Sequence, residues 1–165
     1  MRTLPCMLFA LLLSACGSDT GYHWSTVYRQ DIHTVAVPIF TNRDYHRGVE
    51  FQLTDAIVKK IEEFTPYKVA PRERADTILE GEIVSVVTAT INLDPNTATP
   101  QVQQYLIVIN FTWKDLHTGK ILMSRRNFQQ AADYYPTLGE GLEVASENSV
   151  DRLASAVVNE MEGNW

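Results

Sequence analysis

The 165-residue sequence contains little cysteine, no excess of basic residues and no long apolar run. It has two cysteines, and 14 lysines and arginines stand against 20 acidic residues, for a formal net charge of −6. Surfaces that bind nucleic-acid phosphates are normally basic, so this balance argues against a nucleic-acid partner. The apolar run at residues 4–13 is too short to cross a bilayer, which takes ~20 residues.

Motifs of common catalytic, phosphate-binding and metal sites are also missing. The four histidines have no zinc-type spacing, and neither a G-x-S-x-G nucleophile motif nor a glycine-rich phosphate loop occurs. We therefore expect no cofactor, no metal ion and no enzyme activity. A hydrolase would need a nucleophile and a base that no recognisable arrangement supplies.

What the N-terminus does contain is a short apolar segment that ends in small residues and a cysteine. Arg2 precedes the run, and Leu13, Ser14, Ala15, Cys16 and Gly17 follow it. The length is that of a signal-peptide core. The ending resembles the bacterial lipobox, which implies cleavage after residue 15 and a lipid on Cys16. The alternative is an ordinary signal peptide with a chance cysteine.

Lipidation of Cys16 would determine where the protein resides. Cleavage would remove Cys6, so the mature chain would carry one cysteine and form no internal disulfide. Gly17, where aspartate would favour the inner membrane, points by the usual lipoprotein sorting pattern to the outer membrane. We expect a lipid-anchored protein at its periplasmic face, with residues 16–31 as a tether and residues 32–165 as one domain.

Hydrophobic periodicity predicts two helices and a sheet. Apolar residues recur at helical spacing in residues 49–64 and 142–161, and those stripes are Val49, Leu53, Ala56, Ile57, Ile61 and Phe64, then Leu142, Ala145, Ser149, Leu153, Val157 and Met161. Strands are predicted at residues 33–40, 67–70, 75–91, 103–116 and 121–135, with a projecting loop at 92–101. We expect an α+β two-layer sandwich, with two helices on one face of a four- or five-stranded mixed sheet.

The order of these segments resembles one family of envelope lipoproteins. The segments that carry the resemblance are "GYHW" soon after Cys16, "PIFTN" before the first helix, and "ADTILEGEI" opening a long strand. Together with the closing helix, they are similar to the LPS-assembly lipoprotein LptE family. Gly81 in the last segment would permit close packing. Similar strand motifs occur in penicillin-binding-protein activators and secretion lipoproteins, which remain the alternatives.

Membership would imply a partner and a ligand. Proteins of the LptE family sit in the lumen of the LptD β-barrel, help that barrel to assemble, and contact lipopolysaccharide on its way to the outer leaflet. The resemblance therefore implies an LptD-like outer-membrane barrel and lipopolysaccharide as partners. An activator of a penicillin-binding protein would instead need a long linker to reach through the periplasm.

Arginines near turns and helix starts are candidates for binding the phosphates of lipopolysaccharide. Arg43 and Arg47 precede the first predicted helix, and Arg72 and Arg74 lie between two predicted strands. We take these four as candidate lipopolysaccharide-binding residues, with ordinary surface arginines as the alternative. The family's own binding positions do not transfer, because the long middle strands do not align.

Overall fold

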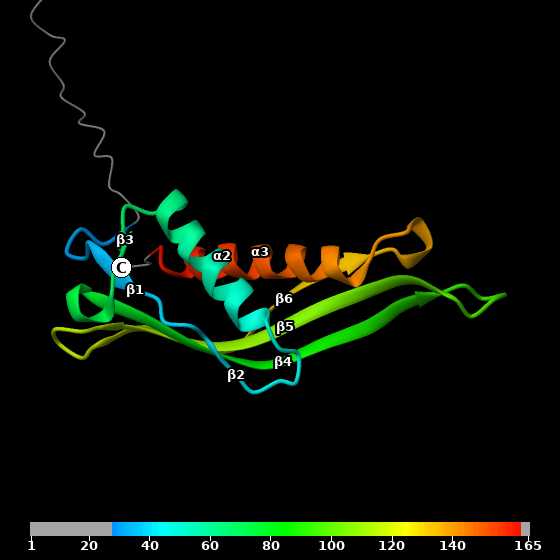
Figure 1. The fold of residues 1–165 in the computed structure, drawn as a ribbon, viewed down its shortest axis with the longest axis horizontal. Helices are drawn as coiled ribbons and strands as arrows, with labels where there is room; N and C mark the ends of the chain where they lie inside the picture. The colour runs from blue at the N-terminus through cyan, green and yellow to red at the C-terminus, as the bar shows by residue number, and fades with distance from the viewer. Residues whose placement is uncertain (1–27, 163–165) are drawn as a thin grey trace, which may run out of the picture.

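The computed structural model describes residues 28–162, in which two helices lie over one face of a long, curved sheet (Figure 1). Cys16, the predicted signal peptide and the "GYHW" segment lie outside the described residues. The elements in chain order are β1 (Thr34–Ala36), β2 (Thr41–Asn42), α2 (Val49–Phe64), β3 (Lys68–Val69), a 3-10 turn (Arg72–Arg74), β4 (Thr77–Leu93), β5 (Pro100–Asp115), β6 (Ile121–Tyr134), a second 3-10 turn (Pro136–Leu138) and α3 (Leu142–Glu160).

The strands form one mixed sheet, which confirms the predicted α+β class. Their order is β3-β1-β4-β5-β6, and the short β2 also pairs with β4. β1 pairs in parallel with β3 and β4, whereas β4, β5 and β6 form an antiparallel meander. The sheet counts six strands because the short β2 lies just beyond the predicted strand at 33–40, of which only Thr34–Ala36 forms a strand.

The core lies between the sheet and the helices. Tyr105, Ile107, Ile109, Phe111 and Trp113 alternate along β5, and all five are buried, as the period-two pattern predicts. Leu53, Ile57 and Ile61 of α2 and Leu153 and Val157 of α3 pack in the same core. Within residues 28–162, no helix is long and apolar enough to span a membrane.

Two ends of the predicted helical stripes are exposed. Phe64 is more than half exposed at the end of α2, where the Lys60 ammonium lies 5.4 Å from its ring centroid. Leu142, the first residue of α3, is exposed as well. The helical period locates the buried face but not where the neighbouring element ends.

The predicted strand at 33–40 is wrong in its extent and in its burial on both faces. β1 pairs with β4 at Thr77 and Ile78, and β2 pairs with β4 at Glu82 and Ile83. Between them, Pro38 and Ile39 are exposed and outside the ladder. Proline has no N–H to donate to a ladder, so the chain leaves the sheet there and returns at Thr41.

The hairpin between β4 and β5 is longer than predicted. β4 continues to Leu93 and β5 begins at Pro100, so the loop is 94–99 rather than 92–101. Two irregularities at Thr90–Leu93 keep the strands paired there, and the Asn92 amide bonds Gln101 at 3.3 Å. The hairpin extends past the start of α3, as Figure 1 shows.

The first described residues are packed against the domain. The Tyr28 hydroxyl lies 2.7 Å from the Glu162 carboxylate and 2.9 Å from the Phe64 carbonyl oxygen. Burial, followed by the bond to Glu162, raises the pKa of Tyr28 to about 12. The packed part of the described chain therefore includes Tyr28, ahead of residue 32, beside the C-terminal ends of α2 and α3.

Candidate interaction surfaces

Arg43 and Arg72 reach the same stretch of β4 from two different segments. Arg43 forms an ion pair with Glu82, and Arg72 forms one with Glu80 at 3.0 Å. Because Glu80 and Glu82 are two residues apart in a strand, their side chains point to the same face. The structure thus joins one arginine of each predicted pair to adjacent carboxylates, and the local charge is balanced.

This face of β4 and β5 is the one that the helices leave open. It carries a shallow hollow of about 510 Å³. Its lining combines apolar residues with polar and charged ones, and the latter are Thr41, Arg72, Glu80, Glu82, Asn110 and Thr112. An anion entering this hollow would meet two glutamates beside the arginine, so phosphate binding there would require the ion pairs to open.

Arg47 and Arg74 lie elsewhere. Arg47 lines a separate groove together with Glu143 and Glu147 of α3. Arg74 is exposed in the 3-10 turn that precedes β4. The four candidate arginines are therefore divided among different surfaces, and the structure does not gather them into one cationic pocket.

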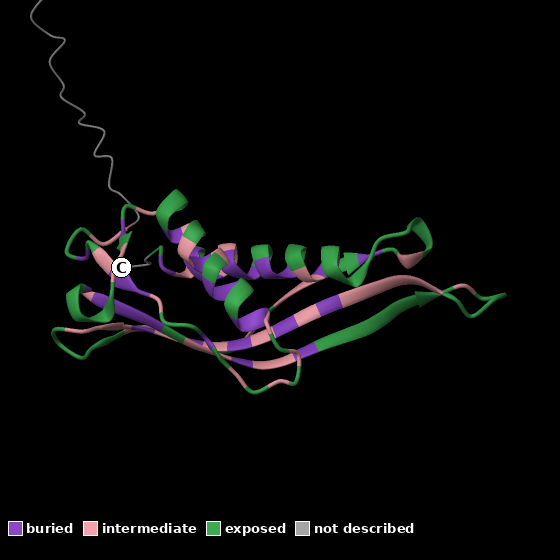
Figure 2. Cartoon of the chain, in the orientation of Figure 1, coloured by how far each residue is buried: buried purple, intermediate pink, exposed green. Residues whose placement is uncertain are grey.

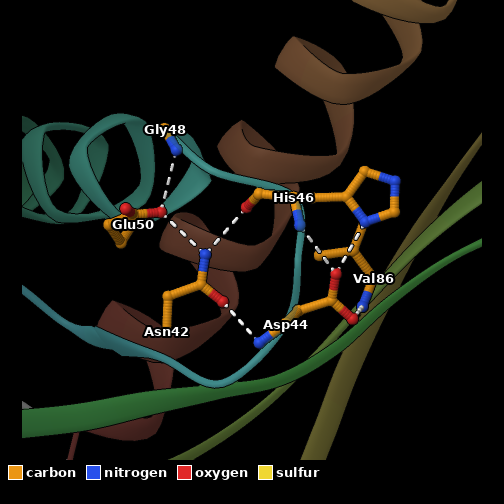
Figure 3. A network of polar contacts seen from close by, with 6 residues as sticks. All are labelled: Asn42, Asp44, His46, Gly48, Glu50 and Val86. Atoms are coloured by element: carbon orange, nitrogen blue, oxygen red, sulfur yellow. Dashed lines mark hydrogen bonds and ion pairs between the residues drawn. The ribbon is translucent and has the colours of Figure 1, made fainter.

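A polar loop that the sequence reasoning missed closes the space between β2 and α2. We call residues 42–50 the clamp loop (Figure 3). Asn42 Nδ2 donates to the His46 carbonyl oxygen and to Glu50 Oε2, both at 2.8 Å. Gly48 N donates to the same Glu50 oxygen at 3.0 Å. Gly48 has φ +97°, a conformation that residues with a Cβ rarely adopt.

Asp44 ties the clamp loop to the edge of β4. One carboxylate oxygen accepts bonds from the backbone and ring nitrogens of His46 at 3.0 and 2.6 Å, and the other accepts from Val86 N at 3.1 Å. Burial by itself raises the pKa of Asp44, but the bonds from His46 and Val86 outweigh it and hold that pKa below its usual value. A sequence signal for this loop was available, because polar residues or glycine occupy every second position from 42 to 50: Asn42, Asp44, His46, Gly48 and Glu50.

The clamp loop is the last element to pair with that edge of β4. Arg43 N donates to the Ile83 carbonyl oxygen at 3.1 Å, and Asp44 then occupies Val86 N. Among the described residues, none pairs with the outer edge of β4 beyond Val86. The rest of this strand, residues 87–93, is drawn as exposed in Figure 2.

A groove of about 520 Å³ opens beside this unpaired stretch. It lies between the start of α2 and the start of α3, over Tyr105 of β5. Tyr105 is the register partner of Thr88 in β4. The remaining lining combines apolar and charged side chains: His46, Arg47, Val49, Gln52, Leu142, Glu143, Ser146 and Glu147.

Within residues 28–162, no group of three or more histidine, cysteine or acidic side chains is arranged to hold a metal ion. The aspartates with lowered pKa values serve turns and strand junctions, as Asp94 and Asp115 do in the two hairpin turns.

Comparison with known proteins identifies the family. The family model described as "LptE: Lipopolysaccharide-assembly" matches residues 32–162, which is nearly all of the folded domain. The chain belongs to this family. It is therefore a lipopolysaccharide-assembly lipoprotein of the cell envelope, and an assembly protein rather than an enzyme. No sequence among the curated proteins matches it.

Solved structures share the fold at low sequence identity. Rare lipoprotein B from Shewanella oneidensis is 14% identical, with a TM-score of 0.54 over 78% of this chain and 93% of the other. The hypothetical protein CT253 from Chlamydia trachomatis is 10% identical, with a TM-score of 0.57 over 80% and 96%. PelC from Paraburkholderia phytofirmans is 13% identical, with a TM-score of 0.52 over 78% and 90%.

Proposed function

We propose that this protein is an outer-membrane lipoprotein that acts as plug and assembly partner of an LptD-like translocon barrel and helps to deliver lipopolysaccharide to the outer leaflet. The observation that carries the proposal is the family match over residues 32–162. The surfaces are compatible with it, because an elongated domain with polar, charge-balanced faces suits the polar lumen of a large barrel.

The proposed anchor is a lipid on Cys16. Tyr28, which is packed against the domain, lies twelve positions after Cys16, and at ~3.3 Å per position this segment reaches at most ~40 Å. An anchor of this length keeps the domain beside its membrane, where a barrel in the same membrane is within reach. It is too short for an activator of a peptidoglycan synthase that works deep in the periplasm.

Copurification from detergent-solubilised outer membrane tests the partnership. We expect a large outer-membrane barrel in stoichiometric amount, and we expect depletion of this protein to lower the quantity of folded barrel. A peptidoglycan synthase in place of the barrel would replace the proposal with the activator function.

Substitution of Cys16 tests the anchor. Cys16→Ala should abolish incorporation of labelled palmitate and release the protein from the membrane, while the domain keeps its fold because Cys16 precedes the packed residues. Palmitate retained in the variant, or a soluble form that is unfolded, would contradict this.

Lipopolysaccharide binding is proposed for the four arginines Arg43, Arg47, Arg72 and Arg74. Charge reversal of Arg43 with Arg47, or of Arg72 with Arg74, should weaken binding of purified lipopolysaccharide more than it weakens the barrel complex. Arg125→Glu is a matched control, since Arg125 lies on β6 in an ion pair with Glu160 at 2.6 Å. Equal losses in all three variants would indicate a general charge effect and no arginine site.

A further inference from the structure

The outer part of β4 presents free backbone groups along one edge. Val86 N points to that edge, because it donates to Asp44 there. Successive residues of a strand direct their N–H and C=O groups to alternate sides, and the pairing with β5 is regular from Val86 to Thr90. The N–H and C=O groups of Thr88 and Thr90 therefore also point to the free edge, whereas those of Val87 and Ala89 bond to β5.

Apart from the irregularities between Thr90 and Leu93, this stretch lacks the features that normally protect a strand edge. Residues 84–93, "VSVVTATINL", contain no charged residue and no proline, and valine, threonine and isoleucine favour extended structure. Val87, Ile91 and Leu93 are 43%, 58% and 51% exposed. An edge of this kind is a template for an added strand.

The opposite edge of the sheet, formed by β6, is protected. Arg125 and Arg126 lie in its middle, followed by Asn127 with φ +51° at an irregularity of the ladder. From α3, Arg152 donates to the Ala131 carbonyl oxygen at 3.1 Å. The outer edge of β4 has irregularities only at its far end, between Thr90 and Leu93, so residues 87–90 are left without charge, bulge or cover.

We propose that residues 87–93 of β4 bind an extended segment of the barrel partner by strand addition, an inference that rests on the proposed function. The uncharged edge matches an uncharged, extended segment, since neither side then buries an unpaired charge. Strands within a closed barrel have both edges paired, so the segment is a loop or chain end of that partner. Alternate side chains of the added strand would lie beside the groove over Tyr105.

A second copy of this chain is a poorer occupant. Asp44 blocks the edge at Val86 and the turn begins at Asp94, so self-pairing is confined to seven residues on each side. A standard stable interface engages ~20–30 residues a side. A barrel that also contacts the rest of the domain supplies the remaining area, whereas two copies joined tip to tip do not.

Backbone substitution tests strand addition directly. Thr88→Pro removes an N–H that points to the free edge while leaving the bonds between β4 and β5 in place. Thr88→Val is the matched control, because it changes the side chain and keeps the N–H. The measurement uses the full-length lipoprotein with a photocrosslinking amino acid at Ala89, compared with one at Gln129 on the protected edge.

We expect the crosslinker at Ala89 to join the copurifying barrel at least fivefold more than that at Gln129. Thr88→Pro should abolish this preference and Thr88→Val should retain it. If Thr88→Pro lowers the melting temperature by more than about 5 °C, the variant Ala89→Lys is used in its place, and the crosslinker is moved to Val87. Residue 89 is exposed and outside the core, so this substitution should leave the fold intact.

Four results would overturn the inference. Copurification of the barrel with equal crosslinking from both edges, or with crosslinking that survives Thr88→Pro in the folded variant, would reject strand addition and leave the proposed function standing. A crosslinked product of twice the protein's own mass would make a second copy the occupant. Absence of any barrel would remove the proposed function, and this inference with it.

Discussion

The two hairpin turns of the sheet have the same local hydrogen bonds, but one turn is packed against the domain and the other is exposed. In the β4–β5 turn, Asp94 Oδ1 accepts bonds from the N–H groups two and three residues later at 2.8 and 3.1 Å, and in the β5–β6 turn Asp115 Oδ1 does so at 2.7 and 2.9 Å. The residue with positive φ is Ala98 in the first and Gly119 in the second.

What lies beneath each turn differs. Leu116, at the β5–β6 turn, packs against the small cluster of Ala36, Ala75 and Ile78, and its N–H donates to the Asp76 carbonyl oxygen at 2.8 Å. Residues 95–99, at the β4–β5 turn, are exposed at the tip of a hairpin that extends past the helices. Turn chemistry closes a hairpin in both places, but only the packed end contributes to the cooperative core.

The largest effect is expected from Gly81, at the packed end of β4. A Cβ at this position would clash with Cε1 of the Phe40 ring, and that ring is itself buried. Gly81→Ala should lower the free energy of unfolding by about 1–3 kcal/mol, measured by denaturant titration, because the ring must move within a filled core.

Two further variants show whether that loss comes from the close approach. Phe40→Leu combined with Gly81→Ala should recover part of it, since the smaller side chain makes room. Gly141→Ala places a Cβ where nothing lies within 4 Å and should cost less. Equal losses at Gly81 and Gly141 would mean that backbone freedom, and not packing, is the cause.

Asp76 gives the next largest effect and depends on pH. Its carboxylate accepts bonds from His33 N at 3.0 Å and Thr34 N at 2.9 Å, which join the start of β1 to the start of β4. The bond from His33 is the main cause that lowers the pKa of Asp76 from 3.8 to about 2. Asp76→Ala should therefore cost about 1–2 kcal/mol at neutral pH, allowing for the solvent-exposed part of the group.

The direction of the pH dependence follows from the lowered pKa. The unfolded chain binds the proton at higher pH than the folded one, so the stabilisation is complete above 3.8 and disappears as the pH falls through about 2. The difference between wild type and Asp76→Ala should narrow over that window. Asp94→Asn, at the exposed turn, should leave the unfolding midpoint unchanged. A gap between wild type and Asp76→Ala that stays constant down to pH 2 would contradict the assignment.

Regular patterns made the packed part of the molecule predictable from sequence. Apolar residues alternate along β5, and Leu53, Ile57 and Ile61 of α2 recur at helical spacing. Each pattern predicts one buried face, and these residues are buried in the structure. Gly81 was also expected at a close approach, and Phe40 is the group that it approaches.

The surfaces were less predictable because they depend on contacts between distant segments. The bond from Val86 N to Asp44 joins residues 42 positions apart, and the ion pairs that hold Arg43 and Arg72 on adjacent glutamates have no local pattern. The free edge of β4 follows from where the clamp loop ends. The period-two pattern of β4 gives its faces, and it carries no information about its edges.

The smallest effects are expected from exchanging the two residues with positive φ. Gly119→Ala, at the packed turn, should cost about 1 kcal/mol, because a Cβ disfavours the left-handed conformation that Gly119 adopts at φ +73°. Ala98→Gly removes the same strain at φ +54°, yet it should change the global free energy of unfolding by less than about 0.5 kcal/mol, because exposed segments open locally before the core unfolds. Hydrogen exchange separates these two levels: Ala98→Gly should slow exchange at the Ala98 turn without altering that of β5 under the helices. A global gain as large as the loss at Gly119 would mean that the tip unfolds together with the core, and that the two ends of the sheet are one cooperative unit.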